Sequence, residues 1–224
     1  MSTELVNVKM FGQTGAVPTP TRPYHHGNLR SALIAAAVAE IESAGAARLS
    51  LREIARRAGV SHAAPAHHFG GKTGVFTAIA AEGFGLLAER TGRRAGQPDA
   101  LLATALAYIE FGVEHRGYFE VMWRPDLHDA SDPGLAAARD RAFEIFYATV
   151  GTGTDSADPD ALRDAAVAAW SAVHGFVVLW LSGNLPAELG RDPAAAALSA
   201  ARGMIAVGRA TERQLSPEEL PSSE

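Results

Sequence analysis

Apolar residues recur at helical spacing along almost the whole chain. One such row, with residues four apart, begins at Leu29 and reaches Ile41. This period places the row on one face of an α-helix, which Gly45 would end. No alternating run rich in Val, Ile and Thr lies between hairpin turns, so no sheet is expected. The pattern predicts an all-α fold of about nine helices.

Several helix starts carry capping residues. Ser50 followed by Glu53 predicts a capping box, and the helix that it opens would stop at Gly59. Ser61 is expected to cap the next short helix. An Asp precedes a Pro at 132–133, 158–159 and 192–193, which predicts an Asp cap before a Pro in the first helical turn.

Composition divides the chain into a basic head and an acidic body. The head is expected at 23–92 and the larger body at 93–212, with a Gly- and Arg-rich hinge near 92–98 and flexible tails at 1–22 and 213–224. Residues 22–95 hold ten Lys and Arg against five acidic residues, whereas 96–224 hold nine against nineteen, within a net charge of −5. A basic head favours a polyanionic partner.

Other features exclude whole classes of protein. There is no cysteine among the 224 residues, which excludes disulfide scaffolds, thiolate zinc sites and cysteine nucleophiles. The first 22 residues lack the layout of a signal peptide, and no unbroken run of about 18 apolar residues is found. We therefore expect a cytoplasmic protein without a membrane span.

The segment 50–69, SLREIARRAGVSHAAPAHHF, has the pattern of a helix-turn-helix unit. A short amphipathic helix is followed by a tight turn at 59–61 and a second short helix. Gly59 can adopt the positive φ that such a turn needs. An ordinary pair of antiparallel helices would show the same helical spacing.

Residues 28–89 resemble the DNA-binding domain of TetR-family transcriptional regulators. The resemblance rests on Ile54-Ala55, then Ala58-Gly59-Val60-Ser61, and on Phe69 and Lys72 at the family's spacing. In the body, the stretch from Trp170 to His174-Gly175 resembles the WHG-type ligand-binding domain. Ala66 stands where the family commonly has Tyr, which removes one expected phosphate contact.

The resemblance implies that the second short helix enters the major groove of DNA, where base edges are distinguishable. Its candidate contacts to bases are His62, Ala63 and His67. Ser50, Arg52, Ser61, His68 and Lys72 are further DNA-contact candidates, mainly to phosphates.

The body carries many aromatic residues in an alanine-rich frame, as an apolar cavity for a small-molecule effector requires. Ordinary core packing would need the same residues. The expected lining residues are Tyr108, Phe111, Phe119, Met122, Trp123, Phe143, Tyr147 and His174, with Phe146 beside them and Arg116, Arg124 and His174 as polar groups.

Two apolar segments, 162–181 and 194–208, fit the last two helices of the family, which form a dimeric four-helix interface. A monomer that buries both segments is the alternative. The expected interface residues are Trp170, Phe176, Val177, Trp180 and Met204.

Motifs for catalysis are incomplete. The sequence Gly70-Gly71-Lys72-Thr73 ends like a P-loop, but Ala66 occupies the position of an essential glycine, and neither H-E-x-x-H nor G-x-S-x-G occurs. We expect no catalytic residue, metal or cofactor. The favoured function is a homodimeric repressor that binds a palindromic DNA operator and is released by an apolar small molecule. An activator, or an all-α enzyme or small-molecule carrier with an incidental basic head, remains an alternative.

Overall fold

The computed structural model describes residues 26–152 and 158–203, and within these two ranges it contains helices and no strand. The all-α prediction is confirmed. The first helices are α1 (His26–Ala44), the 3-10 turn η1 (Ala46–Arg48), α2 (Leu51–Ala58), α3 (Ala64–Phe69) and α4 (Lys72–Gly92). They are followed by α5 (Ala100–Glu114), α6 (Arg116–Met122), α7 (Pro133–Thr152), α8 (Pro159–Leu181) and the 3-10 turn η2 (Ala187–Leu189), and residues 193–203 are helical.

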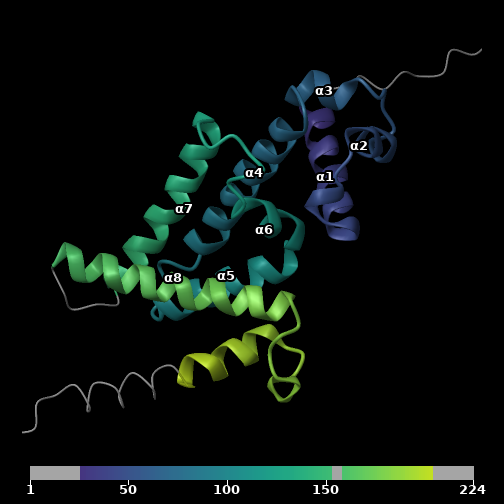
Figure 1. Ribbon diagram of the computed structural model, residues 1–224. Helices are drawn as coiled ribbons and strands as arrows, with labels where there is room; N and C mark the ends of the chain where they lie inside the picture. Colours follow the sequence, from purple (N-terminus) through teal and green to yellow (C-terminus); the bar gives the residue numbers. More distant parts are fainter. Residues whose placement is uncertain (1–25, 153–157, 204–224) are drawn as a thin grey trace, which may run out of the picture.

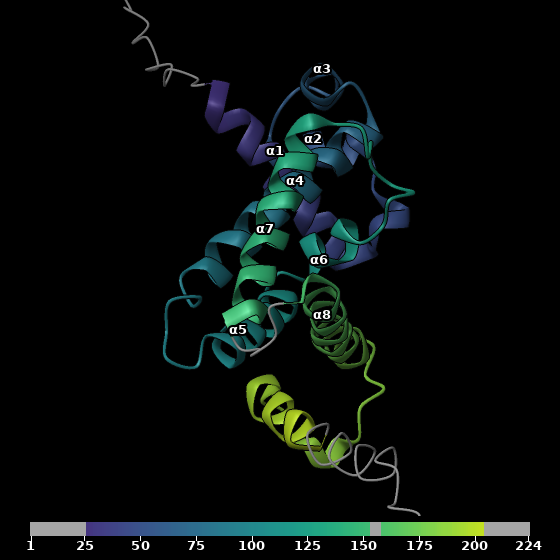
Figure 2. The same cartoon turned by 90° about the vertical axis from the view of Figure 1, so that its left-hand side faces the viewer.

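The helices form a small head and a larger body that share α4. Figure 1 shows α1, α2 and α3 around the start of α4, at the end of the molecule opposite α8. Helices α4 and α7 run side by side, and α6 lies between the body and the end of α1. Figure 2 shows the helix of 193–203 beyond α5 and α8. The predicted tails at 1–22 and 213–224 lie outside the described residues.

One apolar core runs from the head into the body. It joins Leu33 of α1 and Ile54 of α2 to Phe84 of α4, and continues to Phe111 and Val177. Each of these side chains is at most 2% exposed. A continuous core gives a change in the body a packed route to the head.

The predicted Asp caps are present. The carboxylate of Asp158 accepts the N–H of Asp160 at 3.1 Å, that of Asp132 accepts the N–H of Leu135 at 2.8 Å, and that of Asp192 accepts the N–H of Ala194 at 2.9 Å. The same Asp-Pro pattern therefore starts α7, α8 and the last described helix.

Two predictions about helix starts in the head are wrong. Ser50 occupies the N-cap position of α2, but its side chain makes no capping bond, and the carboxylate of Glu53 binds Arg56 and Arg57 instead of the helix start. Helix α3 begins at Ala64, with Ala63 as its N-cap, rather than directly after Ser61. Helix α3 is therefore only six residues long.

Helix α8 is long and apolar enough to cross a bilayer by length and composition alone, which the sequence analysis did not expect. Its outer side includes Val167, Val178 and Leu179, which are between 44% and 48% exposed. An apolar helix whose outer side is uncovered needs a further partner.

Candidate functional site

The turn between α2 and α3 fixes the geometry of the helix-turn-helix unit. Gly59 has φ 67° and ψ 33°, the left-handed conformation that glycine adopts at low cost. The N–H of Val60 donates to the carbonyl of Ala55 at 3.0 Å and closes the turn. Pro65 is buried, so α3 is anchored on the core while Ala66 and His67 face solvent.

The predicted DNA-contacting residues are accessible, with one exception. His68 is half-buried, and its ring meets that of His67 edge-on at 5.6 Å between centroids. The ammonium group of Lys72 donates to the carbonyl of Ala47 at 3.3 Å. This bond links the start of α4 to η1, which lies just before Ser50 in the sequence. The exposed residues are Ser50, Arg52, Ser61, His62, Ala63, His67 and Lys72.

Ion pairs inside the head separate its cations into two groups. Arg57 binds Glu40 at 2.8 Å, and Arg56 binds Glu53. Arg90, at the far end of α4, binds Glu110 at 2.9 Å and Glu114 at 2.6 Å. These pairs leave their arginines little free charge for DNA.

Four cations within 26–92 have no ion pair: Arg30, Arg48, Arg52 and Lys72. Arg30 lies over the ring of Phe69, with its Cζ 5.3 Å from the ring centroid. Sequence reasoning counted Arg30 and Arg48 only in the net charge. Their place in the basic head was a signal for DNA contact. The sequence did not reveal that Arg56, Arg57 and Arg90 form ion pairs whereas Arg30 and Arg48 form none with other described residues.

In the body, five of the predicted effector residues form one aromatic cluster around Trp123. The centroid of Trp123 lies 5.1 Å from those of Phe84 and His174 and 5.4 Å from that of Trp170. Phe119, Phe143 and Tyr108 follow at 6.3, 6.4 and 6.5 Å. The cluster joins α4, α5, α6, α7 and α8.

A short hydrogen-bonded chain runs through this cluster. The hydroxyl of Tyr108 lies 2.9 Å from Nδ1 of His174, and Nε1 of Trp170 donates to the Tyr108 hydroxyl at 3.4 Å. Burial raises the pKa of the Tyr108 phenol and lowers the pKa of the His174 imidazole, because both charged forms would be poorly solvated. Both groups are therefore neutral near pH 7. The buried Nε1 of Trp123 has no hydrogen-bond partner among the residues that the structure describes.

The cluster is filled rather than hollow. The cavity beside Trp123, Phe143 and Trp170 has a volume of about 20 Å³, enough for about one water molecule. The remaining predicted lining residues lie elsewhere: Phe111 and Met122 are buried in the core, whereas Tyr147 is 37% exposed. Arg116 is exposed, and Arg124 is exposed and paired with Asp126 at 2.8 Å.

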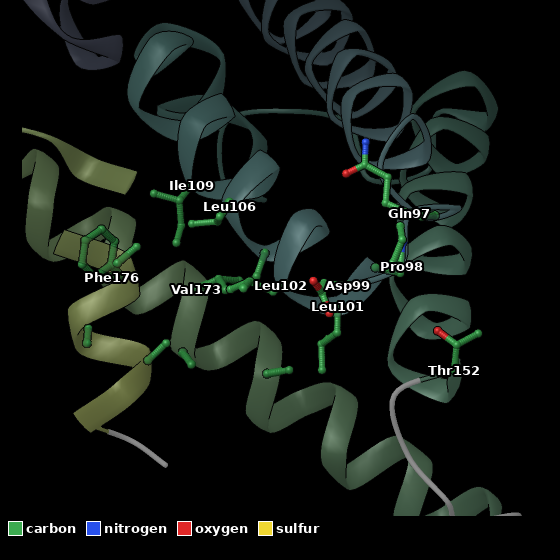
Figure 3. A pocket seen from close by; sticks show the side chains of 18 of the residues that line it. Gln97, Pro98, Asp99, Leu101, Leu102, Leu106, Ile109, Thr152, Val173 and Phe176 are labelled. Carbon is green, nitrogen blue, oxygen red and sulfur yellow. The ribbon is translucent and has the colours of Figure 1, made fainter. Parts of the chain in front are cut away.

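Besides an open cleft of about 820 Å³ between α3, α4 and the start of α7, a large open space lies in the body between α5, α8 and the helix of 193–203. This crevice has a volume of about 760 Å³, within the usual range for small-molecule sites. In Figure 3 its labelled side chains extend from Phe176 and Ile109 at one end to Pro98 and Thr152 at the other. None of the eight predicted effector residues lines it.

Comparison with protein-family models gives two matches. Residues 33–79 match the family described as bacterial regulatory proteins of the tetR family, and residues 101–204 match the tetracyclin repressor-like C-terminal domain. The chain belongs to the TetR family of transcriptional regulators. It is therefore a DNA-binding regulator with a C-terminal ligand-binding domain, which confirms the prediction of a DNA-binding regulator.

Solved structures of similar fold agree with this assignment. A Rhodococcus sp. RHA1 protein of unknown function is 30% identical, with a TM-score of 0.66, covering 81% of this chain and 96% of that one. The TetR-family regulator PfmR from Thermus thermophilus is 22% identical (TM-score 0.54, covering 65% and 84%). FadR from Bacillus subtilis, solved with stearoyl-CoA, is 17% identical (TM-score 0.58, covering 75% and 94%). A comparison with curated proteins finds no match.

The expected dimer residues of this TetR-family chain that lie within α8 are buried or half-buried. Trp170 belongs to the aromatic cluster, and Phe176 and Val177 are 8% and 0% exposed. Trp180 stacks on Phe176 at 5.9 Å between centroids. Phe176 and Val177 are packed within one chain, whereas Trp170 and Trp180 remain partly exposed. The exposed Val167 and Val178 are further candidates for a dimer interface. Met204 lies outside the described residues.

Proposed function

We propose that the protein is a homodimeric repressor that leaves a palindromic operator when a small molecule binds its body. The observation that carries this proposal is the sharing of α4. Its first turn holds Lys72 beside η1, and its middle holds Phe84 against Trp123 of the aromatic cluster. A movement of α4 caused by a ligand in the body would therefore displace the start of α4 and the neighbouring α3.

Further contacts tie the head to the body on both sides of α4. The hydroxyl of Thr77 in α4 accepts the N–H of Asp129 at 2.9 Å. In α6, the carboxylate of Glu120 accepts the N–H of Ala46 at 2.8 Å. Such contacts let a movement in the body change the position of the head. An effector releases DNA if it binds the DNA-free state more tightly than the DNA-bound state.

The DNA contacts that we propose are Ser50, Arg52, Ser61, His62, Ala63, His67, His68 and Lys72, together with Arg30 and Arg48. A homodimer formed by the outer face of α8 would present two α3 helices to successive major grooves, about 34–36 Å apart. In this proposal the protein regulates transcription by binding DNA and an effector, catalyses no reaction, and acts in the cytoplasm. Regulators of similar fold include NalD, a repressor of a multidrug efflux pump in Pseudomonas aeruginosa, and FadR solved with stearoyl-CoA.

The test is a genome-wide map of bound DNA combined with expression of the adjacent genes. A repressor predicts a palindromic consensus and higher expression of those genes when the protein is deleted. Lower expression on deletion would show an activator. Binding to duplex DNA that does not weaken with increasing salt would contradict the proposed phosphate contacts.

A further inference from the structure

The crevice between α5, α8 and the helix of 193–203 is elongated and largely apolar. Along α5 it extends from Leu101 to Ile109, eight residues or about 12 Å at the rise of an α-helix. Alanines of α8 and the last described helix form the facing wall: Ala169, Ala172, Ala197, Ala200 and Ala201. Such a shape fits a slender chain better than a compact ring system.

The crevice is separate from the part of the outer face of α8, around Val167 and Val178, that we assign to the dimer. Phe176 lines the crevice and Val178 lies on the outer face, and two residues correspond to about 200° around a helix. A second copy seated on Val167 and Val178 would therefore leave the crevice accessible. The crevice also lies apart from the filled aromatic cluster, with which it shares no lining residue.

Polar groups gather at the end near the connection between α4 and α5. Among the described residues that line the crevice, Gln97, Asp99 and Thr152 have polar side chains, and Asp99 is the ionisable one. Asp99 is exposed, makes no ion pair within the described ranges, and makes no capping bond to α5. Arg94 lines a smaller adjoining cleft of about 310 Å³ and not the crevice. Asp99 lines both, and the carboxylate of Glu110 in the smaller cleft is paired with Arg90.

We propose that this crevice is the effector site and that it takes an elongated apolar ligand with a positively charged end. The chain of the ligand lies between the leucines of α5 and the alanines opposite, and its cation lies beside Asp99. This inference rests on the proposed function. Residues 95–99, which line the crevice, belong to the connection between α4 and α5. A ligand that orders this connection acts on the helix that carries Lys72.

The probe is decyltrimethylammonium, whose extended chain is about as long as the crevice, titrated calorimetrically below its aggregation concentration into the full chain. Decanoate, with the same apolar chain and the opposite charge, is the matched ligand. We expect decyltrimethylammonium to bind more tightly than decanoate. Asp99→Asn should weaken the binding of the cation about three- to five-fold, as expected for an exposed charge pair, without weakening that of decanoate.

Ala172→Leu tests the site by filling it. This variant should weaken binding of the cation at least ten-fold, whereas Ala137→Leu, an exposed position on α7, should leave it unchanged. Thermal unfolding of both variants checks that each is folded. Equal affinity for both ligands would overturn the charge assignment, and unchanged binding by a folded Ala172→Leu variant would overturn the site.

Two further outcomes separate this site from the repressor mechanism. Binding that depends on Ala172 and Asp99 but leaves DNA affinity unchanged would support the crevice as a site and contradict effector release. If no ligand binds and Ala172→Leu alters the oligomeric state in sedimentation, a second copy occupies the crevice and the proposal is wrong.

Discussion

At the scale of single residues, Lys72 is the cation whose role in DNA binding is most open to measurement. Its ammonium group is exposed at the start of α4, next to η1. We expect Lys72→Ala to weaken binding to all DNA sequences about equally, and to reduce the slope of log affinity against log salt by about one. The measurement is a salt titration with operator and unrelated duplexes.

Arg94→Ala is the matched control for Lys72→Ala. Arg94 is exposed and lies beyond the opposite end of α4, about 30 Å away for a helix of 21 residues. That separation exceeds the screening length of about 8–10 Å at physiological salt, so the slope should not change. A changed sequence preference with an unchanged salt slope in Lys72→Ala would contradict a phosphate contact.

Trp123 distinguishes a packed core from the wall of an effector cavity. Its ring contacts those of Phe84, Trp170 and His174, and the adjoining cavity is about 20 Å³. We expect Trp123→Ala to lower the free energy of unfolding by about 3–5 kcal/mol, which thermal or urea unfolding measures. Trp123→Phe, which keeps a ring, should lose less. A Trp123→Ala variant with wild-type stability and a blunted effector response would instead identify a cavity wall.

His174 gives the body a pH-dependent stability. Because burial lowers the pKa of the folded imidazole, the unfolded chain binds the proton more readily, and stability decreases as the pH falls through about 6.5. We expect the melting temperature to fall between pH 7.5 and 5.5, and His174→Gln to reduce that dependence. Glu114 and Asp126 have lowered pKa values, so their contributions lie below this range. If the melting temperature of His174→Gln depended on pH as that of the wild type does, His174 would not be the source of the pH dependence.

At the scale of helices, α6 approaches its neighbours through glycines. A Cβ on Gly117 would lie 2.9 Å from Cγ1 of Val38 and 3.0 Å from its carbonyl oxygen. We expect Gly117→Ala to separate α6 from α1 and to destabilise the protein by about 1–3 kcal/mol. Gly85→Ala in α4 meets open space, and should be neutral or stabilise by up to about 1 kcal/mol. Chemical denaturation of the two variants measures these changes. Equal changes in the free energy of unfolding would contradict a close approach of α6 to α1 at Gly117.

Helices were predictable from the sequence where local chemistry decides them. An Asp before a Pro starts α7 and α8 because the cap forms within three residues. The capping box at Ser50 was wrong: its hydroxyl makes no capping bond, and the carboxylate of Glu53 binds Arg56 and Arg57. Which side of α8 is buried could not be predicted, because the helix is apolar nearly all round and only its packing against α5 and α7 buries Val177. The aromatic residues predicted a cluster in the body. Whether that cluster encloses a cavity depends on side-chain packing, which the spacing of residues along the sequence does not determine.

At the scale of the whole molecule, head and body act as one packed unit. The core is continuous from Leu33 to Val177, and the described contacts across it include the Thr77–Asp129 and Ala46–Glu120 hydrogen bonds. The crevice escaped sequence reasoning because alanines and a connecting loop line it, and neither carries a compositional signal. A site of this kind arises only when three distant segments are assembled.

Assembly of two copies is the largest-scale property that the structure lets us test. Val178 is 46% exposed on the outer face of α8, so a charge there would be buried without a partner in the proposed dimer. We expect Val178→Asp to sediment as a monomer while keeping its helical content and melting behaviour. The same change at Ala137, exposed on α7, should leave the dimer intact. A dimer gains its DNA affinity by linking two half-sites, so the monomeric variant should bind a full palindrome about 10²–10⁴-fold more weakly but a single half-site almost as well as wild type. If Val178→Asp remains dimeric and binds the palindrome normally, the two copies associate through another surface and the outer face of α8 has a different partner.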